Sequence, residues 1–298
     1  MKLARLFAAA TLAALALFAP LAHAVGTLGP VALKAHYTTL APQLAHNAFG
    51  GPLVLQSEEV QRRIDGDVYA VLDHPFAQVS AALSDPGQWC DILILHLNTK
   101  YCHRSDADGA TRVLLRVGRK EPQAIEAASL LTFEWRPPQV RPDYLAALME
   151  SRDGPYDTRD YRLLAEAVPL DAGHTFLHMG YAFSYGGASH FAMHIYLNTI
   201  GRDKVGFTRV PAGGAAGARD EGYVGGMRGV AERNTMRYYL AIDAYLSSLS
   251  APPGQQLEKR LAAWFDATEK YPRQLHEVDR DAYLRMKRNE VQRQATAR

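Results

Sequence analysis

Two hydrophobic periods follow one another in one stretch of the chain. Over residues 68–73 apolar side chains alternate between two faces, which predicts a short strand. Over residues 76–83 they recur at helical spacing, and Pro75 between the two periods suits the first turn of a helix. Residues 85–87, Asp-Pro-Gly, are turn formers that end this helix, and Trp89 lies just beyond them.

Alternating segments separated by turn residues then continue to residue 185. The predicted strands are residues 96–104, 111–120, 129–136, 161–170 and 174–185. Residues 141–151 are predicted as a short helix that Pro142 begins. A further short helix is predicted over residues 39–48, before the first strand.

Residues 174–185 and 189–199 each carry apolar side chains on one face, so they are predicted to pair as a hairpin. A three-residue loop at 186–188 brings the two faces together, with Tyr181 opposite Met193 and Met179 opposite Ile195. The shared face also holds Phe183. Because it is aromatic and contains methionine, it suits the wall of an apolar ligand site, although it suits an ordinary core nearly as well.

Four histidines fall on the other face of this predicted hairpin. They are His174, His178, His190 and His194. Two histidines four residues apart on one strand are about 13 Å apart, so neither pair on its own strand can chelate one ion. Only a cross-strand pair of His178 and His194 could, and no carboxylate is placed with them. We therefore expect half-exposed polar sheet residues and no metal.

The strongest helical pattern covers residues 227–249. Its apolar stripe also contains Asn234 and Tyr238, whose polar tips need partners wherever the stripe is buried. Two interpretations remain open. The two side chains either bind a polar group of a ligand or satisfy the backbone of neighbouring strands. Trp135 could line the same interior, although a tryptophan is more often part of the core.

A strand, a proline, one short helix, an Asp-Pro break and a tryptophan, as in residues 67–92, resemble the opening of the helix-grip superfamily. This superfamily, SRPBCC, contains the START and polyketide-cyclase-like proteins. The resemblance covers about residues 56–249. It implies an α+β fold in which a curved antiparallel sheet wraps around a long C-terminal helix, here residues 227–249, and encloses an apolar cavity.

The N-terminus has the pattern of a secretory signal peptide. Lys2 and Arg5 precede an apolar run over residues 6–18, which is too short to span a bilayer, and Ala22-His23-Ala24 is a small-x-small cleavage site. We expect cleavage after Ala24 and, since the chain has only two cysteines, a bacterial periplasm. In that compartment Cys90 and Cys102 are expected to form a disulfide worth about 3 kcal/mol; two buried free thiols are the alternative.

Composition excludes some partners. Without Lys2 and Arg5 the chain has 31 basic and 31 acidic residues, a balance that gives no electrostatic signature of nucleic-acid binding. No motif for a nucleophile, a dinucleotide or a P-loop is present, so no cofactor is expected.

The expected organisation has four parts: a signal peptide at 1–24, an N-terminal segment at 25–55, the START-like domain at 56–250 and a helical extension at 251–298. Leu257, Leu261, Trp264 and Phe265 of the extension could dock on the domain. The basic region from Arg280 onward could touch an anionic membrane surface, but a solvated helix face explains it better.

The first functional hypothesis is a periplasmic protein that binds and carries a hydrophobic small molecule, a lipid by preference. Its binding residues would be Trp135, Tyr181, Phe183, Met193, Ile195, Asn234 and Tyr238. The first alternative is a cavity-based enzyme of the polyketide-cyclase type with Glu232, Asn234 and Tyr238 as acid–base candidates, although we favour a protein without catalysis. The second is an envelope assembly factor that acts through its C-terminal helices.

Overall fold

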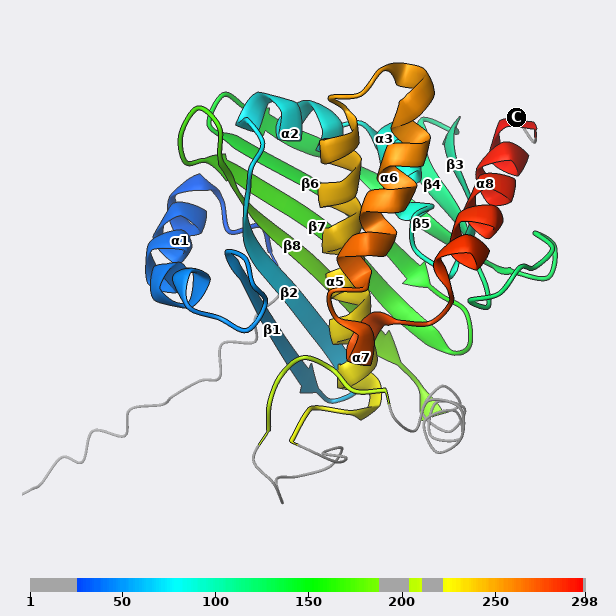
Figure 1. Cartoon of the computed structure of the whole chain (residues 1–298), viewed down its shortest axis with the longest axis horizontal. Coiled ribbons are helices and arrows are strands. Elements are labelled where there is room, and N and C mark those ends of the chain that lie inside the picture. Colours follow the sequence, from blue (N-terminus) through cyan, green and yellow to red (C-terminus); the bar gives the residue numbers. More distant parts are fainter. Residues whose placement is uncertain (1–25, 188–203, 211–221, 297–298) are drawn as a thin grey trace, which may run out of the picture.

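One antiparallel sheet is the centre of the computed structural model, which describes residues 26–187, 204–210 and 222–296 (Figure 1). Its eight strands within these residues are β1 (Leu53–Val60), β2 (Arg63–Leu72), β3 (Thr99–Ala107), β4 (Ala110–Val117), β5 (Ser129–Arg141), β6 (Tyr144–Asp153), β7 (Thr158–Pro169) and β8 (Thr175–Tyr185). They are ordered β1-β2-β8-β7-β6-β5-β4-β3. The last strand therefore lies between β2 and β7 and joins the two parts of the sheet.

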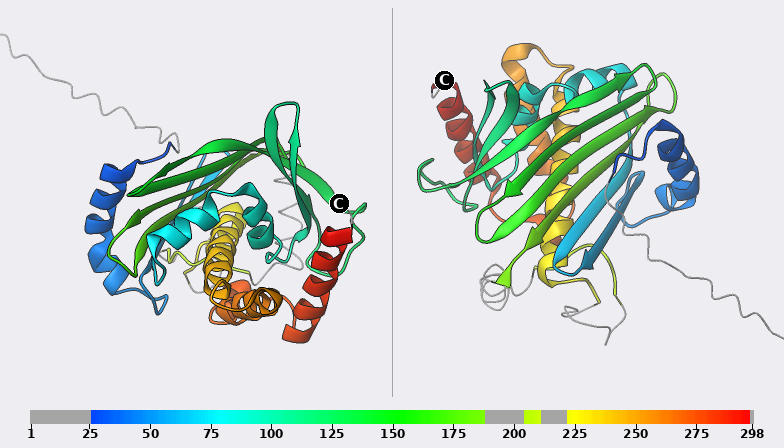
Figure 2. Two further views of the ribbon diagram at one scale, coloured as in Figure 1. Left: turned by 90° about the horizontal axis from the view of Figure 1, so that it is seen from above. Right: turned by 180° about the vertical axis from the view of Figure 1, so that it is seen from behind.

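Helices cover both faces of this sheet. They are α1 (Pro30–Ala45), α2 (Phe76–Leu83), α3 (Pro86–Leu93), α5 (Gly226–Ser248), α6 (Pro253–Thr268), α7 (Pro272–Leu275) and α8 (Arg280–Thr296). The long helix α5 crosses the concave face with α2 and α3 beside it, whereas α1 packs on the opposite face (Figure 2). This is the α+β helix-grip fold that the sequence predicted.

The side-chain alternation of the strands explains why one sheet supports two layers of helices. On β8, Leu177 and Met179 belong to the main core that includes α5. Phe176, one position away, belongs to a second cluster beneath α1 with Leu33 and Leu40. Successive strand residues point to opposite faces, so both faces of β8 are buried.

A glycine sets the distance between α5 and the sheet. A Cβ atom added to Gly66 of β2 would lie 2.5 Å from the Thr235 hydroxyl oxygen of α5. Any larger side chain at Gly66 would push the helix away, because such a contact is far inside van der Waals distance. The sequence therefore permits close helix–sheet packing at this point.

The predicted helix over residues 141–151 is wrong, because β5 ends at Arg141 and β6 begins at Tyr144. The strand pairs with β5 on one side and β7 on the other. Leu145 and Met149 face the main core, whereas Tyr144 and Ala146 face α1. Burial on both faces removes the polar alternation that would have marked a strand, so the apolar run resembled a helix.

The predicted hairpin between residues 174–185 and 189–199 is also wrong. Both edges of β8 are already occupied, since Tyr181 lies opposite Gly66 of β2 and opposite Leu163 of β7. No edge is left for a further strand. Residues 189–199, with Met193, Ile195, His190 and His194, lie outside the described residues, as does the expected signal peptide.

Two local boundaries also differ from the prediction. The first helix is α1, which begins at Pro30 rather than at residue 39 and ends at Ala45. Asp85 does not simply end a helix; its carboxylate accepts a hydrogen bond from the Gly87 backbone N–H at 2.7 Å and caps the new helix α3. The side chain of an N-cap residue thus starts a helix where the Asp-Pro-Gly sequence indicated only a turn.

The expected disulfide is present. Cys90 of α3 is bonded to Cys102 of β3, with their Cα atoms 5.2 Å apart. The bond ties the concave-face helices to the edge strand of the sheet. The presence of a disulfide is compatible with an oxidising compartment.

The C-terminal helices pack onto the rest of the chain. Leu261, Trp264 and Phe265 of α6 are buried, as expected, and α8 lies along β3. The interpretation of the last helix as a solvated face is wrong for Lys287 and Glu290, which are completely buried. None of the described helices is long and apolar enough to cross a membrane.

Candidate functional site

The face of α5 that points to the sheet carries two polar side chains that keep accessible surface. Asn234 and Tyr238 are half-buried, whereas the residues between them, Thr235, Met236 and Arg237, are buried. The Tyr238 ring packs against Tyr181 of β8, with 5.3 Å between ring centroids. These inward-facing side chains therefore retain surface that the surrounding protein does not cover.

Aromatic rings continue from this point across the inner face of the sheet. Tyr161 of β7 lies 6.3 Å from Tyr181, 5.4 Å from Phe183 and 6.3 Å from Phe133 between ring centroids. Tyr161 is also half-buried. The centre of the inner face is thus a row of aromatic rings with phenol groups among them, a surface that can contact an apolar molecule and still offer hydrogen bonds.

The phenols of this row are neutral at ordinary pH. Burial raises the pKa of Tyr238 above its usual value, and the nearby Tyr161 acts in the same direction. Burial likewise raises the pKa of Tyr181 well above its usual value, although a hydrogen bond with Asn234 opposes this. Neutral phenols can donate or accept a hydrogen bond, so they can bind a polar group without introducing charge.

Sequence reasoning missed His96, which follows α3 and precedes β3. Its ring centroid lies 5.0 Å from that of Tyr238 and the residue is 2% exposed. Its Nδ1 accepts a hydrogen bond from the Asn98 backbone N–H at 3.1 Å. The only sequence signal was a single histidine in the apolar run ILILHLN, a pattern that does not distinguish a binding residue from a core residue.

Burial lowers the pKa of His96 well below its usual value, and the cations Arg237, Lys287 and Lys120 lower it further. The imidazole is therefore neutral. Since Nδ1 is an acceptor, the ring proton is on Nε2. A side-chain interaction with Asn234 opposes the lowering of the pKa, although within the described part of the chain no contact at Nε2 has the geometry of a full hydrogen bond.

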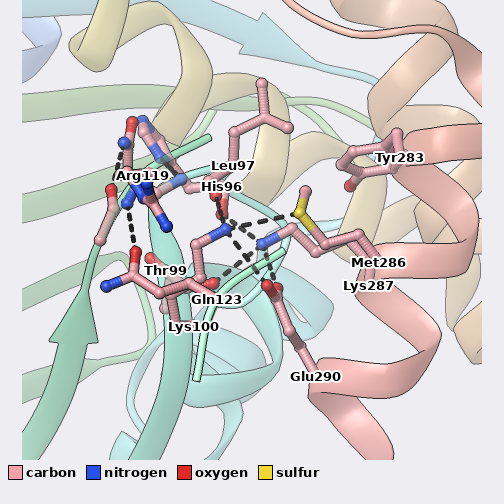
Figure 3. Close-up of polar contacts among 12 residues, drawn as sticks. His96, Leu97, Thr99, Lys100, Arg119, Gln123, Tyr283, Met286, Lys287 and Glu290 are labelled. Carbon is pink, nitrogen blue, oxygen red and sulfur yellow. Dashed lines mark hydrogen bonds and ion pairs between the residues drawn. The ribbon is translucent and has the colours of Figure 1, made fainter. Parts of the chain in front are cut away.

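Helix α8 fixes the backbone of the segment that carries His96. Lys287 Nζ donates hydrogen bonds to the carbonyl oxygens of His96 at 2.6 Å and Thr99 at 2.9 Å. The Tyr283 hydroxyl donates to the Leu95 carbonyl at 3.0 Å. Figure 3 shows Lys287 pointing from α8 into this turn. The C-terminal helix is therefore the outer support of one end of the site.

A second buried lysine lies beside the first. Lys100 Nζ donates to the Leu97 carbonyl at 2.8 Å and lies 3.2 Å from a Glu290 carboxylate oxygen, while Lys287 bonds the other oxygen at 2.8 Å (Figure 3). Burial lowers the pKa of both lysines, that of Lys287 to about 8, and Glu290 opposes this in each case. One carboxylate thus holds two buried ammonium groups together.

The structure brings together only some of the residues that the sequence proposed. Tyr181, Phe183, Asn234 and Tyr238 lie in one group, as the contacts above show. Trp135 is on the same inner face and half-buried, but its ring neighbour is Trp89, at 6.4 Å. Met193 and Ile195 lie outside the described residues.

Glu232, the expected acid–base carboxylate, belongs to another part of the structure. One oxygen accepts hydrogen bonds from the backbone N–H groups of Phe207 and Thr208, and the other accepts one from the Ser57 hydroxyl. The residue is completely buried. With both oxygens occupied by the fold, Glu232 joins α5 to β1 and to residues 207–208, and it is not available to the inner face.

His178 is not the half-exposed sheet residue that was expected. It is buried on the outer face beneath α1, between Asp67 at 2.7 Å from Nε2 and Glu166 at 3.1 Å from Nδ1. Although burial opposes it, the two carboxylates raise the pKa of His178 to about 9. Tyr144 donates a further hydrogen bond to Glu166. This ion cluster stabilises the α1 side of the sheet; within the described residues no three His, Cys, Asp or Glu groups are placed to hold a metal.

Comparisons with known proteins give fold-level likeness only. No family model matches the chain. No curated protein matches it either. Among solved structures, human StAR-related lipid transfer protein 5 is 9% identical over 58% of this chain and 89% of its own, with a TM-score of 0.32. The Zhui aromatase/cyclase from Streptomyces sp. R1128 is 14% identical over 68% and 94%, with a TM-score of 0.31.

Norcoclaurine synthase from Thalictrum flavum is 9% identical over 50% of this chain and 89% of its own, with a TM-score of 0.32. The helix-grip fold follows from the strand order and from the position of α5 across the concave face.

Proposed function

We propose that this protein binds a hydrophobic small molecule, of lipid character, between α5 and the inner face of the sheet, and carries it through the bacterial periplasm. The observation that carries this proposal is the accessible surface that Asn234, Tyr238 and Tyr161 keep on faces directed into the protein. Inward-facing surface in an otherwise well-buried core is where a ligand gains contact.

The chemistry of the lining supports an amphiphile rather than a purely polar ligand. The aromatic row supplies apolar contact, and each CH₂ group removed from water contributes about 0.8 kcal/mol. Tyr238 and Asn234 supply neutral hydrogen-bonding groups at the helix side. A molecule with a long apolar part and a small polar end satisfies both.

The compartment is proposed from the sequence and the disulfide together. The N-terminal pattern with cleavage after Ala24 and the Cys90–Cys102 bond both fit an exported protein. Expression of the full chain in a bacterial host, followed by N-terminal sequencing of the periplasmic fraction, should give Val25 as the first residue. An unprocessed chain that stays in the cytoplasm contradicts this part of the proposal.

Native mass spectrometry of the exported protein, purified without detergent or organic solvent, tests the binding. We expect a fraction of molecules to carry a co-purified hydrophobic molecule. Tyr238→Phe should retain less of it. Tyr37→Phe is the matched control, because that ring packs against Phe176 on the α1 side of the sheet. Protein that is always ligand-free, including after incubation with total bacterial lipid, contradicts the proposal.

A further inference from the structure

His96 presents one ring N–H that makes no hydrogen bond of good geometry with the described residues. Its Nδ1 is occupied by the Asn98 N–H, so the ring proton is on Nε2. That Nε2 is buried, and within the described residues its interaction with the Asn234 side chain lacks the geometry of a full hydrogen bond. Buried donors almost always have an acceptor, and an exception calls for an explanation.

The neighbours of His96 place its ring N–H at the proposed site. The His96 ring lies against Tyr238, and Asn234 is close enough to affect its pKa. These are the two half-buried polar residues on the inward face of α5. A molecule that contacts Tyr238 and Asn234 therefore reaches the neighbourhood of His96.

The surroundings of His96 favour a negatively charged acceptor. The charged side chains that lower its pKa are all cations, namely Arg237, Lys287 and Lys120. Burial is the main cause of the low pKa, and the cations add to it. Although these cations also pair with Glu277 and Glu290, they attract an anion placed beside the ring. Hydrogen bonds to a charged acceptor are also about twice as strong as those between neutral groups.

The donor is held in place before any ligand arrives. Lys287 bonds the His96 carbonyl, Tyr283 bonds the Leu95 carbonyl and Lys100 bonds the Leu97 carbonyl. Three consecutive carbonyl groups of the turn are thus fixed from outside the inner face. Figure 3 shows Lys287 and Lys100 at two of them. A fixed donor loses little conformational entropy when it binds an acceptor.

We infer that His96 is a specificity-determining residue, whose Nε2–H donates a hydrogen bond to the carboxylate of the bound amphiphile. The inference rests on the proposed function and narrows its ligand class to molecules with a carboxylate at the polar end. A fatty alcohol of the same chain length has the same apolar part but lacks the charge, so it should bind more weakly.

Calorimetric titration of the full mature protein with dodecanoate and with dodecanol tests this inference. Wild-type protein should bind dodecanoate about tenfold to a hundredfold more tightly, the range of one hydrogen bond to a charged group. His96→Leu should lose most of this preference, because dodecanoate binding weakens much more than dodecanol binding, and His96→Gln should recover part of the preference through its amide donor. His46→Leu, an exposed position at the end of α1, is the matched control.

The outcomes distinguish the role inferred for His96 from the proposed binding of a hydrophobic ligand. If His96→Leu keeps the full preference for dodecanoate, the inference is wrong while ligand binding stands. If wild-type protein binds neither compound, both claims fail. A readout that needs no variant is the ¹H–¹⁵N signal of the His96 ring. We expect dodecanoate to move the Nε2–H proton downfield and dodecanol to leave it in place. An unmoved signal with bound dodecanoate overturns the inference.

Discussion

Lys287 Nζ lies 2.6 Å from the carbonyl oxygen of His96, although the two residues are 191 positions apart in the chain. This contact joins the C-terminal helix α8 to the turn that presents an imidazole to Tyr238. The extension beyond the grip helix is therefore part of the architecture of the candidate site. Its basic residues are not all surface charges.

Lys287→Met should destabilise the protein by about 3–5 kcal/mol, because it leaves the His96 and Thr99 carbonyls without their donor and removes one partner of Glu290. Urea unfolding measures the free energy. The neighbouring Arg288→Met is the control. That side chain forms an exposed ion pair with Glu258, so its loss should change the free energy of unfolding far less than the loss of Lys287. Equal effects of the two substitutions would contradict the role given to Lys287.

The stability contribution of Lys287 should rise with pH between about 8 and 10.5. Burial lowers its pKa to about 8, below the ordinary value of 10.5. Between these values the unfolded chain binds a proton that the folded protein does not, so raising the pH favours folding, by an amount on the order of 3 kcal/mol. The difference in unfolding free energy between wild type and Lys287→Met should grow across this window. A constant difference would show that the pKa is not lowered.

His178 should have the opposite pH dependence. Its pKa is raised to about 9 because Asp67 and Glu166 bind the imidazolium, although burial opposes this. Tyr69 of β2 and His36 of α1 also face the His178 ring. The stabilisation is complete below pH 6.5 and is lost as the pH rises through 9. Urea unfolding at pH 6 and pH 9.5 should show this loss in wild type. His178→Gln should be less stable throughout and lack that component; the same pH dependence in both proteins would refute the ion cluster.

Gly66→Ala should cost about 1–3 kcal/mol, since the added methyl group meets the Thr235 hydroxyl at 2.5 Å and forces α5 away from β2. Adding Thr235→Ala should recover part of this loss, because the colliding oxygen is then absent. Gly51→Ala is the control, because no atom of the described residues lies within 4 Å of the new Cβ. Thermal unfolding compares the four proteins. Similar shifts for Gly66→Ala and Gly51→Ala would mean that the helix does not rest on the sheet at this point.

Replacing both Cys90 and Cys102 by serine should lower the free energy of unfolding by about 2–4 kcal/mol. The disulfide joins residues 12 positions apart, and without it the unfolded chain gains conformational entropy. Wild-type protein in excess reductant should approach the same free energy of unfolding. If reductant has no effect on wild type, the bond contributes nothing or does not form in solution.

The sequence predicted the elements whose hydrophobic period is undisturbed. The grip helix α5 and strands such as β4 follow directly from their patterns, and the paired cysteines were identified correctly. Prediction failed at β6, where α1 covers the outer face and burial on both faces removes the alternation. The strand β8 was predicted correctly, but its partners were not, because β2 and β7 occupy both of its edges. Prediction also failed at His178, because the carboxylates that surround it come from β2 and β7.

The candidate site was predictable only in part. Asn234, Tyr238, Tyr181 and Phe183 could be placed on an inward face by spacing alone. His96 could not, because its role depends on the tertiary position of a turn and on the helix α8 that holds it. A contact across 191 positions leaves no periodic signal in the chain.

Fluorescence quenching by 12-bromododecanoate tests most directly whether the ligand lies between α5 and the sheet. In a variant whose single tryptophan is introduced by Tyr161→Trp, in the aromatic row of the inner face, bound ligand should quench the emission, because bromine quenches tryptophan at contact. In a variant that keeps only Trp264, stacked on Tyr283 between α6 and α8, emission should stay unchanged. Quenching of Trp264 alone, or of neither tryptophan at saturating ligand, would contradict the account.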